Sequence, residues 1–139
     1  MAVILIVEDE LQVCERLERA IERQGHVAIT ALELIQAFNA IENDPDIEVI
    51  LLDLNMPIVP GLLTNANRAG LDAIEYFVIA RNEISKKKQL DLKLPPIIAF
   101  TSVSELIEQA AETKEIFRVI YKGDSNWEED LLESISSFV

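Results

Sequence analysis

Residues 48–57 read Glu-Val-Ile-Leu-Leu-Asp-Leu-Asn-Met-Pro, and this stretch decides the fold class of the chain. Val49 to Leu52 form an uninterrupted branched apolar run, too short for a typical helix and typical of a strand buried on both faces of a parallel sheet. Asp53 ends the run, and Pro57 indicates that the strand is over because proline cannot donate to a central ladder. Ligands of open parallel sheets gather at the carboxyl ends of the strands, so Asp53 stands where a site is expected.

The composition predicts one globular domain over residues 1–139. Half of the residues (50%) are hydrophobic, and the chain has only 4 Gly and 5 Pro, which argues against disorder. No apolar run approaches the roughly 20 residues that span a bilayer, and no basic segment precedes the short run from Ala2 to Val7. We therefore expect neither a signal peptide nor a membrane anchor, and a cytoplasmic location.

Charge and residue counts exclude several classes of function. The chain has 25 acidic and 12 basic residues, a net charge of −13, which opposes direct binding to nucleic acid or to an anionic membrane. A protein or a cation is the expected partner. Cys14 is the only cysteine and His26 the only histidine, which excludes an internal disulfide and the usual zinc sites. It also excludes a Cys-His or Ser-His hydrolase unless His26 is the base. We interpret Cys14 as a small apolar filler and His26 as a polar residue that starts a strand.

Strand patterns alternate with helical patterns along the whole chain. Short apolar runs predict strands at residues 3–7, 26–31, 49–52, 97–100 and 119–121. Apolar residues at helical spacing predict helices at residues 10–24, 32–43, 71–88 and 104–113, with a last helix that begins after Asn126 as its cap. Gly25 stands where a helix cap belongs. Five β units and five α units without a linker predict a single three-layer α/β sandwich with right-handed crossovers between parallel strands.

Each longer helix has one apolar side that we expect to face the sheet. These sides comprise Val13, Leu17, Ala20 and Ile21; Leu34, Ile35, Phe38 and Ile41; Ile74, Phe77, Val78 and Ile84; and Leu131, Leu132, Ile135 and Phe138.

Polar residues follow four of the five predicted strands. The strands end, in order along the chain, in Glu8-Asp9, Asp53, Thr101-Ser102 and Lys122. All of these residues are expected on one edge, because parallel strands end on the same side of a sheet. Carboxylates without a histidine or thiol predict a site for a hard cation, and Mg²⁺ suits it. A lysine and a threonine hydroxyl match phosphate oxygens, so the implied chemistry is phosphoryl transfer with one aspartate as nucleophile.

With these residues in hand, the sequence resembles a two-component response-regulator receiver domain (CheY-like). The matching pieces are Val-Glu-Asp-Glu at 7–10, Leu-Asp-Leu-Asn-Met-Pro at 52–57, Phe-Thr-Ser at 100–102 and Tyr-Lys at 121–122. They occur in the family's order and at roughly its spacing, across essentially the whole chain. The resemblance implies a flavodoxin-like fold with a five-stranded parallel sheet in the order 2-1-3-4-5.

The resemblance also implies a metal site. Asp9, Asp53 and the backbone carbonyl of Asn55 would ligate Mg²⁺, and Glu8 would reach the ion directly or through water. The choice of Asp53 as nucleophile has a physical basis, because a constrained turn follows it. Asp9 instead opens a helix, whose dipole favours keeping it charged as a ligand.

The phosphoryl group has its own set of implied contacts. Asp53 would accept it from a histidine kinase or a histidine phosphotransfer protein, and Lys122 would bind its oxygens. Thr101 would supply the hydroxyl that moves to meet the phosphate, with Ser102 beside it. Such a protein is a signalling phospho-acceptor that transfers and loses the group by self-catalysis, and not an enzyme acting on other substrates.

Each of these residues also has a purely structural interpretation. Thr101 and Ser102 could cap the following helix, with Ser102 and Glu105 in a capping-box pattern. Lys122 could be solvated, Asp53 could be a turn residue, and Glu8-Asp9 could be acids at a helix start. Chance alone does not readily place such residues at four separate strand ends, and this favours the functional interpretation.

Three features depart from the family pattern. Gly123 follows Lys122 where the family usually has proline, often in a cis bond, so the geometry around Lys122 is expected to be less fixed. Val119 stands where the family often has a rotating tyrosine or phenylalanine. The signal is therefore expected to use another route, such as movement of residues 103–114. The stretch 58–70 is longer than the family's usual link. It is either a solvated insertion or a loop that contacts the site or a specific kinase.

Several hypotheses about function remain open. The chain stops at Val139, just after the last predicted helix, so we expect a stand-alone receiver without an output domain, monomeric or dimerising on phosphorylation. An alternative is a phosphorylation-independent interaction module (a pseudo-receiver), with a contact surface formed by Glu105, Glu108, Glu112 and an exposed Trp127. A metal-dependent phosphatase of the aspartyl-nucleophile type is disfavoured, because Asn55 stands where its second aspartate belongs.

Overall fold

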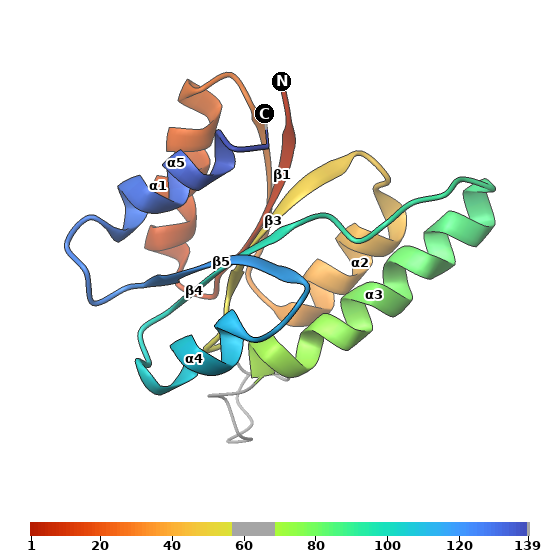
Figure 1. Cartoon of the computed structure of the whole chain (residues 1–139). Helices are drawn as coiled ribbons and strands as arrows, with labels where there is room; N and C mark the ends of the chain where they lie inside the picture. The colour runs from red at the N-terminus through yellow and green to blue at the C-terminus, as the bar shows by residue number, and fades with distance from the viewer. Residues whose placement is uncertain (57–68, 139) are drawn as a thin grey trace.

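A computed structural model describes residues 1–56 and 69–138 of the chain. The strands are β1 (Val3–Val7), β2 (Val27–Ala31), β3 (Ile47–Asp53), β4 (Ile97–Thr101) and β5 (Ile116–Tyr121). The helices are α1 (Leu11–Arg23), α2 (Leu34–Asn43), α3 (Ala69–Lys88), α4 (Glu105–Ala111) and α5 (Trp127–Ile135). Strands and helices alternate as the sequence predicts, and Figure 1 shows the sheet between two layers of helices.

The five strands form one parallel sheet in the order β2-β1-β3-β4-β5. The predicted strand order is therefore confirmed. Val7 pairs with Leu52, Asp53 with Phe100 and Thr101 with Tyr121, so the carboxyl ends of four neighbouring strands finish at nearly the same level. The residues that follow these ends are thereby brought to one edge.

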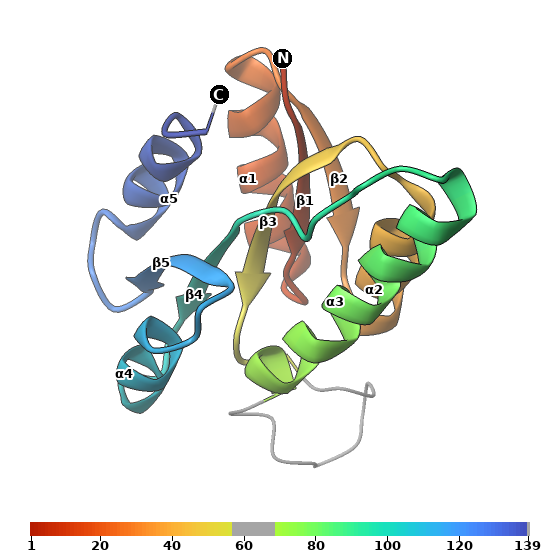
Figure 2. The same cartoon turned by 45° about the vertical axis from the view of Figure 1, so that its right-hand side comes forward.

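Alternating residues of each central strand enter two separate cores. Along β3, Val49 and Leu51 face the layer that contains α1 and α5, whereas Ile50 and Leu52 face the layer that contains α2, α3 and α4. Figure 2 shows α1 and α5 on one side of the sheet and α2 and α3 on the other. Both faces of β3 are buried, which is why its sequence is a continuous apolar run and not an alternating one.

Helix α1 ends at the predicted glycine. Gly25 has φ 87°, its N–H donates to the carbonyl of Glu22 at 3.0 Å, and the N–H of His26 donates to the carbonyl of Ile21 at 3.2 Å. This pair of bonds is a Schellman motif, in which glycine takes the left-handed conformation without the strain that a side chain adds. The ring Nδ1 of His26 then accepts a hydrogen bond from the N–H of Ala2 at 3.0 Å, which fixes the beginning of β1.

Some predicted helix faces are shifted. Ile35 is 58% exposed and Ala37 is buried in its place on α2, while Phe38 is half-buried. Phe138, 36% exposed, lies beyond the end of α5. Ser134 is buried in that helix, where its hydroxyl donates to the carbonyl of Asp130 at 2.8 Å. The apolar count missed Ser134 because a hydroxyl bonded within its own helix packs as a small core residue.

The predicted helix cap at Asn126 is also wrong in detail. Asn126 precedes α5, but its side chain makes no capping hydrogen bond.

Arg81 is a buried cation on α3 that the sequence pattern did not single out. It is 2% exposed, and it lies between Phe77 and Ile84 in the stripe that faces the sheet. Its Nη1 donates to the carbonyl of Asp44 at 3.1 Å and its Nη2 donates to the carbonyl of Ile47 at 2.9 Å. Burial lowers the pKa of the guanidinium, against the opposing charge of Asp44. The side chain thus ties α3 to the turn that leads into β3.

We expect Arg81→Ala to lower the free energy of unfolding by about 2–4 kcal/mol, because it leaves a cavity and two carbonyls that lose their donor. Urea denaturation followed by circular dichroism measures this change. Arg19→Ala, which removes an exposed arginine of α1, is the matched control and should cost less than about 0.5 kcal/mol. Equal stability of the two variants would show that Arg81 does not hold this junction.

Candidate functional site

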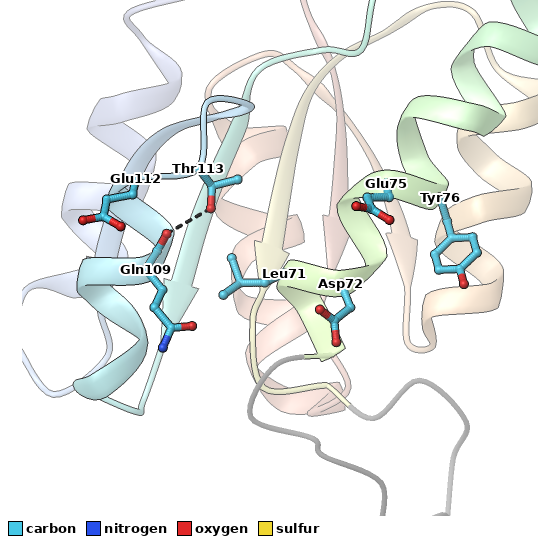
Figure 3. Close-up of a pocket in the computed structure, with 7 residues that line it drawn as sticks. All are labelled: Leu71, Asp72, Glu75, Tyr76, Gln109, Glu112 and Thr113. Atoms are coloured by element: carbon cyan, nitrogen blue, oxygen red, sulfur yellow. Dashed lines mark hydrogen bonds between the residues drawn. The ribbon is translucent and has the colours of Figure 1, made fainter.

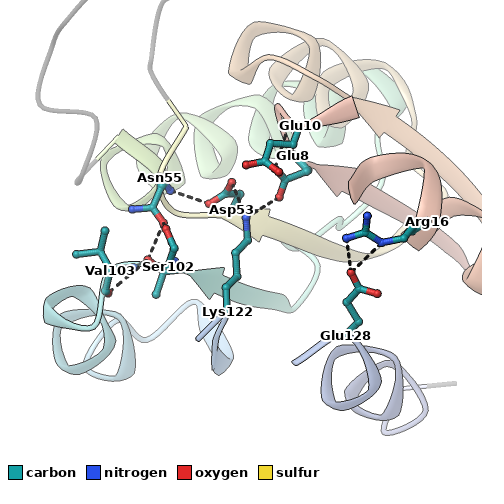
Figure 4. A network of polar contacts seen from close by, with 10 residues as sticks. Glu8, Glu10, Arg16, Asp53, Asn55, Ser102, Val103, Lys122 and Glu128 are labelled. Atoms are coloured by element: carbon teal, nitrogen blue, oxygen red, sulfur yellow. Dashed lines mark hydrogen bonds and ion pairs between the residues drawn. The ribbon is translucent and has the colours of Figure 1, made fainter. Parts of the chain in front are cut away.

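The carboxyl edge of the sheet brings together the polar residues that follow the strands (Figure 4). Glu8 and Asp9 follow β1, Asp53 is the last residue of β3, and Lys122 follows β5. Glu8, Asp9 and Asp53 each offer a carboxylate oxygen, and these oxygens lie within 4.8 Å of one another. The sequence analysis predicted this convergence from strand ends alone.

Lys122 bonds two buried carboxylates at once. Its Nζ lies 3.1 Å from Oε2 of Glu8 and 3.3 Å from Oδ2 of Asp53. Glu8 is 0% and Asp53 3% exposed, and the lysine side chain is 15% exposed. Asp9 is exposed at the mouth of the cluster. One ammonium therefore faces two buried carboxyl groups, and the exposed Asp9 adds a third acidic group beside them.

This arrangement shifts the pKa of all three groups. Burial and, to a lesser extent, the charge of Asp53 raise the pKa of Glu8 to about 8, although Lys122 opposes the shift. Burial also raises the pKa of Asp53, although Lys122 and the N–H of Asn55 oppose the shift. Burial by itself would lower the pKa of Lys122, but the charges of Asp53 and Glu8 outweigh it and raise that pKa. A second cation at this edge would relieve the two acids.

Asn55 connects the end of β3 to the end of β4. Its backbone N–H donates to Oδ1 of Asp53 at 2.9 Å. Its side-chain Oδ1 accepts from the hydroxyl of Thr101 at 2.7 Å and from the N–H of Ser102 at 3.0 Å. The sequence predicted a role for the backbone carbonyl of Asn55 only, so the side-chain contacts are an addition. They fix the turn after Asp53 against the neighbouring strand.

Thr101 is buried at the end of β4 and does not cap α4. Its Oγ1 accepts from the N–H of Val103 at 3.0 Å, which closes a local turn. The residue that precedes α4 is Ser104, whose side chain makes no capping bond. The alternative in which Thr101 and Ser102 cap this helix, with a Ser102–Glu105 capping box, is therefore wrong. The hydroxyl of Thr101 is instead directed at Asn55, and Ser102 is exposed beside it.

Two aromatic rings border the ammonium of Lys122, and the sequence analysis did not assign them to the site. Nζ lies 5.1 Å from the ring centroid of Phe100 and 5.7 Å from that of Trp127. The two rings stack on each other with centroids 5.7 Å apart and an interplanar angle of 22°. Trp127 is half-buried in this stack, so the prediction that it is exposed is wrong.

The ring of Tyr121 explains why glycine follows Lys122. A Cβ at Gly123 would overlap the ring of Tyr121, which occupies the space beside it. A proline or any larger residue there would displace Tyr121. Val119, two residues before Tyr121, is half-buried and packs against the core that contains α2, α3 and α4. The stretch 58–68 lies outside the described residues.

A separate hollow of about 640 Å³ opens between α3 and α4 (Figure 3). Its lining residues are Leu71, Asp72, Glu75, Tyr76, Gln109, Glu112 and Thr113. None of these residues belongs to the polar cluster at the strand ends. Glu8, Asp53 and Lys122, whose pKa values are shifted, lie instead at the sheet edge. That edge therefore remains the candidate site.

Comparisons with known proteins identify the fold. No protein-family model matches the chain. A stretch of 60 residues is 38% identical to the transcriptional regulatory protein PrrA of Mycobacterium tuberculosis, covering 42% of this chain. The PrrA protein of Mycobacterium leprae matches to the same extent. The match spans about a quarter (25%) of the length of these curated relatives.

Solved structures resemble the chain over its whole length. The response regulator TrrA of Thermotoga maritima, solved in complex with Mg²⁺ and BeF, has a TM-score of 0.68 and 23% identity, and the match covers 100% of both chains. A receiver domain of a Francisella response regulator has a TM-score of 0.69 and 15% identity, and the match covers 99% of this chain and 96% of that one. This chain has the response-regulator receiver fold. No helix in the described part of this receiver fold is long and apolar enough to cross a membrane.

We expect Lys122→Met to lower the free energy of unfolding by about 3 kcal/mol at pH 9 in the absence of divalent cations, because above the raised pKa of Glu8 the buried carboxylates lose their counter-charge. Asp53→Asn removes one of those charges, and it should leave the free energy of unfolding unchanged or raise it. Urea denaturation in the presence of a chelator compares the two variants. Equal destabilisation by both would contradict an excess of negative charge in this cluster.

Proposed function

We propose that this chain is a receiver that accepts a phosphoryl group on Asp53 from a histidine kinase or a histidine phosphotransfer protein, with Mg²⁺ as cofactor. It would then signal through contacts with a protein partner. One observation carries the proposal: a buried aspartate at a strand end lies within hydrogen-bond reach of a lysine and beside two further carboxylates. This combination supplies a nucleophile, a positive charge for phosphoryl oxygens and a set of oxygen ligands for a hard cation.

The donor set fits Mg²⁺. Three carboxylate oxygens lie within 4.8 Å of one another, and the cluster contains no histidine or thiol that would prefer a softer metal. Glu8, Asp9 and Asp53 would hold the ion together with the backbone carbonyl of Asn55. When bound, Mg²⁺ supplies charge neutralisation between the carboxylates and the incoming phosphoryl group.

The remaining steps belong to residues of the chain. A carboxylate oxygen of Asp53 forms a bond to phosphorus while the bond from phosphorus to the donor's imidazole nitrogen breaks, and the imidazole leaves with the electron pair. Lys122 binds the phosphoryl oxygens, because its Nζ already lies 3.3 Å from Asp53. Thr101 must release Asn55 to offer its hydroxyl to the new group, since the two are bonded before phosphorylation.

The second hypothesis is an interaction module that works without phosphorylation. The observation in its favour is a set of exposed acids, Glu105 and Glu108 on α4 and Glu112 just after it. Such a surface suits a basic partner, although an acidic helix face is also an ordinary solvated surface. The two hypotheses differ in whether Asp53 is modified.

We expect the protein, incubated with acetyl phosphate and Mg²⁺, to gain one phosphoryl group by intact mass, and to gain none when Mg²⁺ is removed by a chelator. Asp53→Asn should abolish the gain, because the amide is not a nucleophile. Asp46→Asn, which changes an exposed aspartate in the turn before β3, is the matched control and should be modified like the wild type. Absence of any gain in the wild type would reject phosphorylation and favour the interaction module.

We also expect Mg²⁺ alone to raise the Tm. A ligand present at about 100 times its Kd stabilises the folded state by roughly 2.7 kcal/mol. Asp9→Asn should weaken this response, because Asp9 is an exposed member of the oxygen cluster and its loss costs little folding energy. Asp91→Asn, also exposed but remote in sequence from the strand ends, should keep the full response. A Tm that does not change with Mg²⁺ would remove the metal from the proposal.

A further inference from the structure

We propose that Phe100 and Trp127 form an aromatic clamp that positions the ammonium of Lys122 between Glu8 and Asp53. Neither ring touches the reacting atoms, so both are positioning residues that act through Lys122. The part of this inference that concerns phosphoryl transfer rests on the proposed function. The part that concerns the position of Lys122 stands on the geometry alone.

Lys122 needs a lateral restraint. A lysine side chain has four flexible carbons and ends in a point charge with three donors, so two carboxylate contacts do not fix its path. Its neighbours in the chain do not supply a restraint, because Gly123 has no side chain and the ring of Tyr121 packs beside Gly123. Unrestrained, the ammonium could swing towards the exposed Asp9 or towards solvent.

The two rings supply that restraint. Nζ lies 5.1 Å and 5.7 Å from the centroids of Phe100 and Trp127, within the distance of about 6 Å at which a ring face attracts a cation. The attraction is stronger away from water, and the lysine side chain is 15% exposed while Phe100 is fully buried. Nζ contacts two carboxyl groups on one side and lies near two rings on the other. These contacts together favour one position for the ammonium.

The clamp is itself fixed to the site and to the neighbouring helices. Phe100 pairs in register with Asp53 across β4 and β3, so the ring and the nucleophile are held by adjacent strands. Trp127 is the first residue of α5, and the next residue, Glu128, accepts a 2.7 Å bond from Nη2 of Arg16 on α1. The clamp therefore connects the end of the sheet to the layer of α1 and α5.

A double-mutant cycle tests the position of Lys122 without any phosphorylation. Trp127→Leu, Lys122→Met and the combined variant are compared by urea denaturation followed by circular dichroism. If the indole attracts the ammonium, Trp127→Leu should cost about fivefold more in the folding equilibrium constant when Lys122 is present than when it is absent. A coupling below twofold would overturn the clamp, whatever the outcome of phosphorylation.

The rate of phosphorylation by acetyl phosphate and Mg²⁺ tests the consequence. Trp127→Leu should react about 5- to 30-fold more slowly than the wild type, whereas Trp127→Phe, which keeps a ring, should recover most of the rate. Phe117→Leu removes an aromatic residue that packs on Phe138 and should leave the rate unchanged. If Trp127→Leu does not fold, Trp127→Met replaces it, since a thioether fills the space without a ring.

The outcomes separate the two proposals. A wild-type protein that is not phosphorylated rejects the proposed function, and the double-mutant cycle then decides on the clamp by itself. Slow reaction of Trp127→Leu with recovery in Trp127→Phe supports the clamp. Equal rates in the wild type and in a folded Trp127→Leu variant overturn its role in the reaction.

Discussion

The contact of one lysine with two buried carboxylates is the interaction on which the candidate site depends. Lys122 faces Glu8 and Asp53 at 3.1 and 3.3 Å, at an edge where the backbone has just left the sheet. Removing charges from water is expensive, and here two buried acids share one cation, so the pKa of each acid is raised. In the proposed function, a divalent cation relieves this shortage of positive charge at the edge.

The parallel sheet holds these charged groups close together because four of its strands end at the same edge. Register between β1, β3, β4 and β5 sets the level at which each strand ends, and apolar layers on both faces keep those strands rigid. Asn55 adds a cross-connection, since its side chain accepts from both Thr101 and Ser102 while its N–H donates to Asp53. Asp53 is thus bonded on one side to the turn that follows it and on the other to Lys122.

Most of the fold and the core of the site could be predicted from the sequence, for a physical reason. Buried parallel strands are continuous apolar runs, and the residue that ends each run is placed by topology at a common edge, so Asp53 and Lys122 could be found without coordinates. Side-chain packing could not be found in this way. The exposure of Ile35, the burial of Arg81 and the stack of Trp127 on Phe100 depend on which neighbours from distant parts of the chain fill the space.

Arg81, which is buried, and Lys122, which is half-buried, illustrate how the surroundings of a cation change its behaviour. Arg81 donates to two backbone carbonyls, and burial lowers its pKa because dipoles only partly replace water. Lys122 contacts two carboxylates, whose charges raise its pKa despite burial. A carbonyl dipole is fixed by the backbone and cannot leave, so Arg81 locks a junction. A carboxylate can be modified or can turn to a metal, so in the proposed function Lys122 passes from the carboxylates to the phosphoryl oxygens.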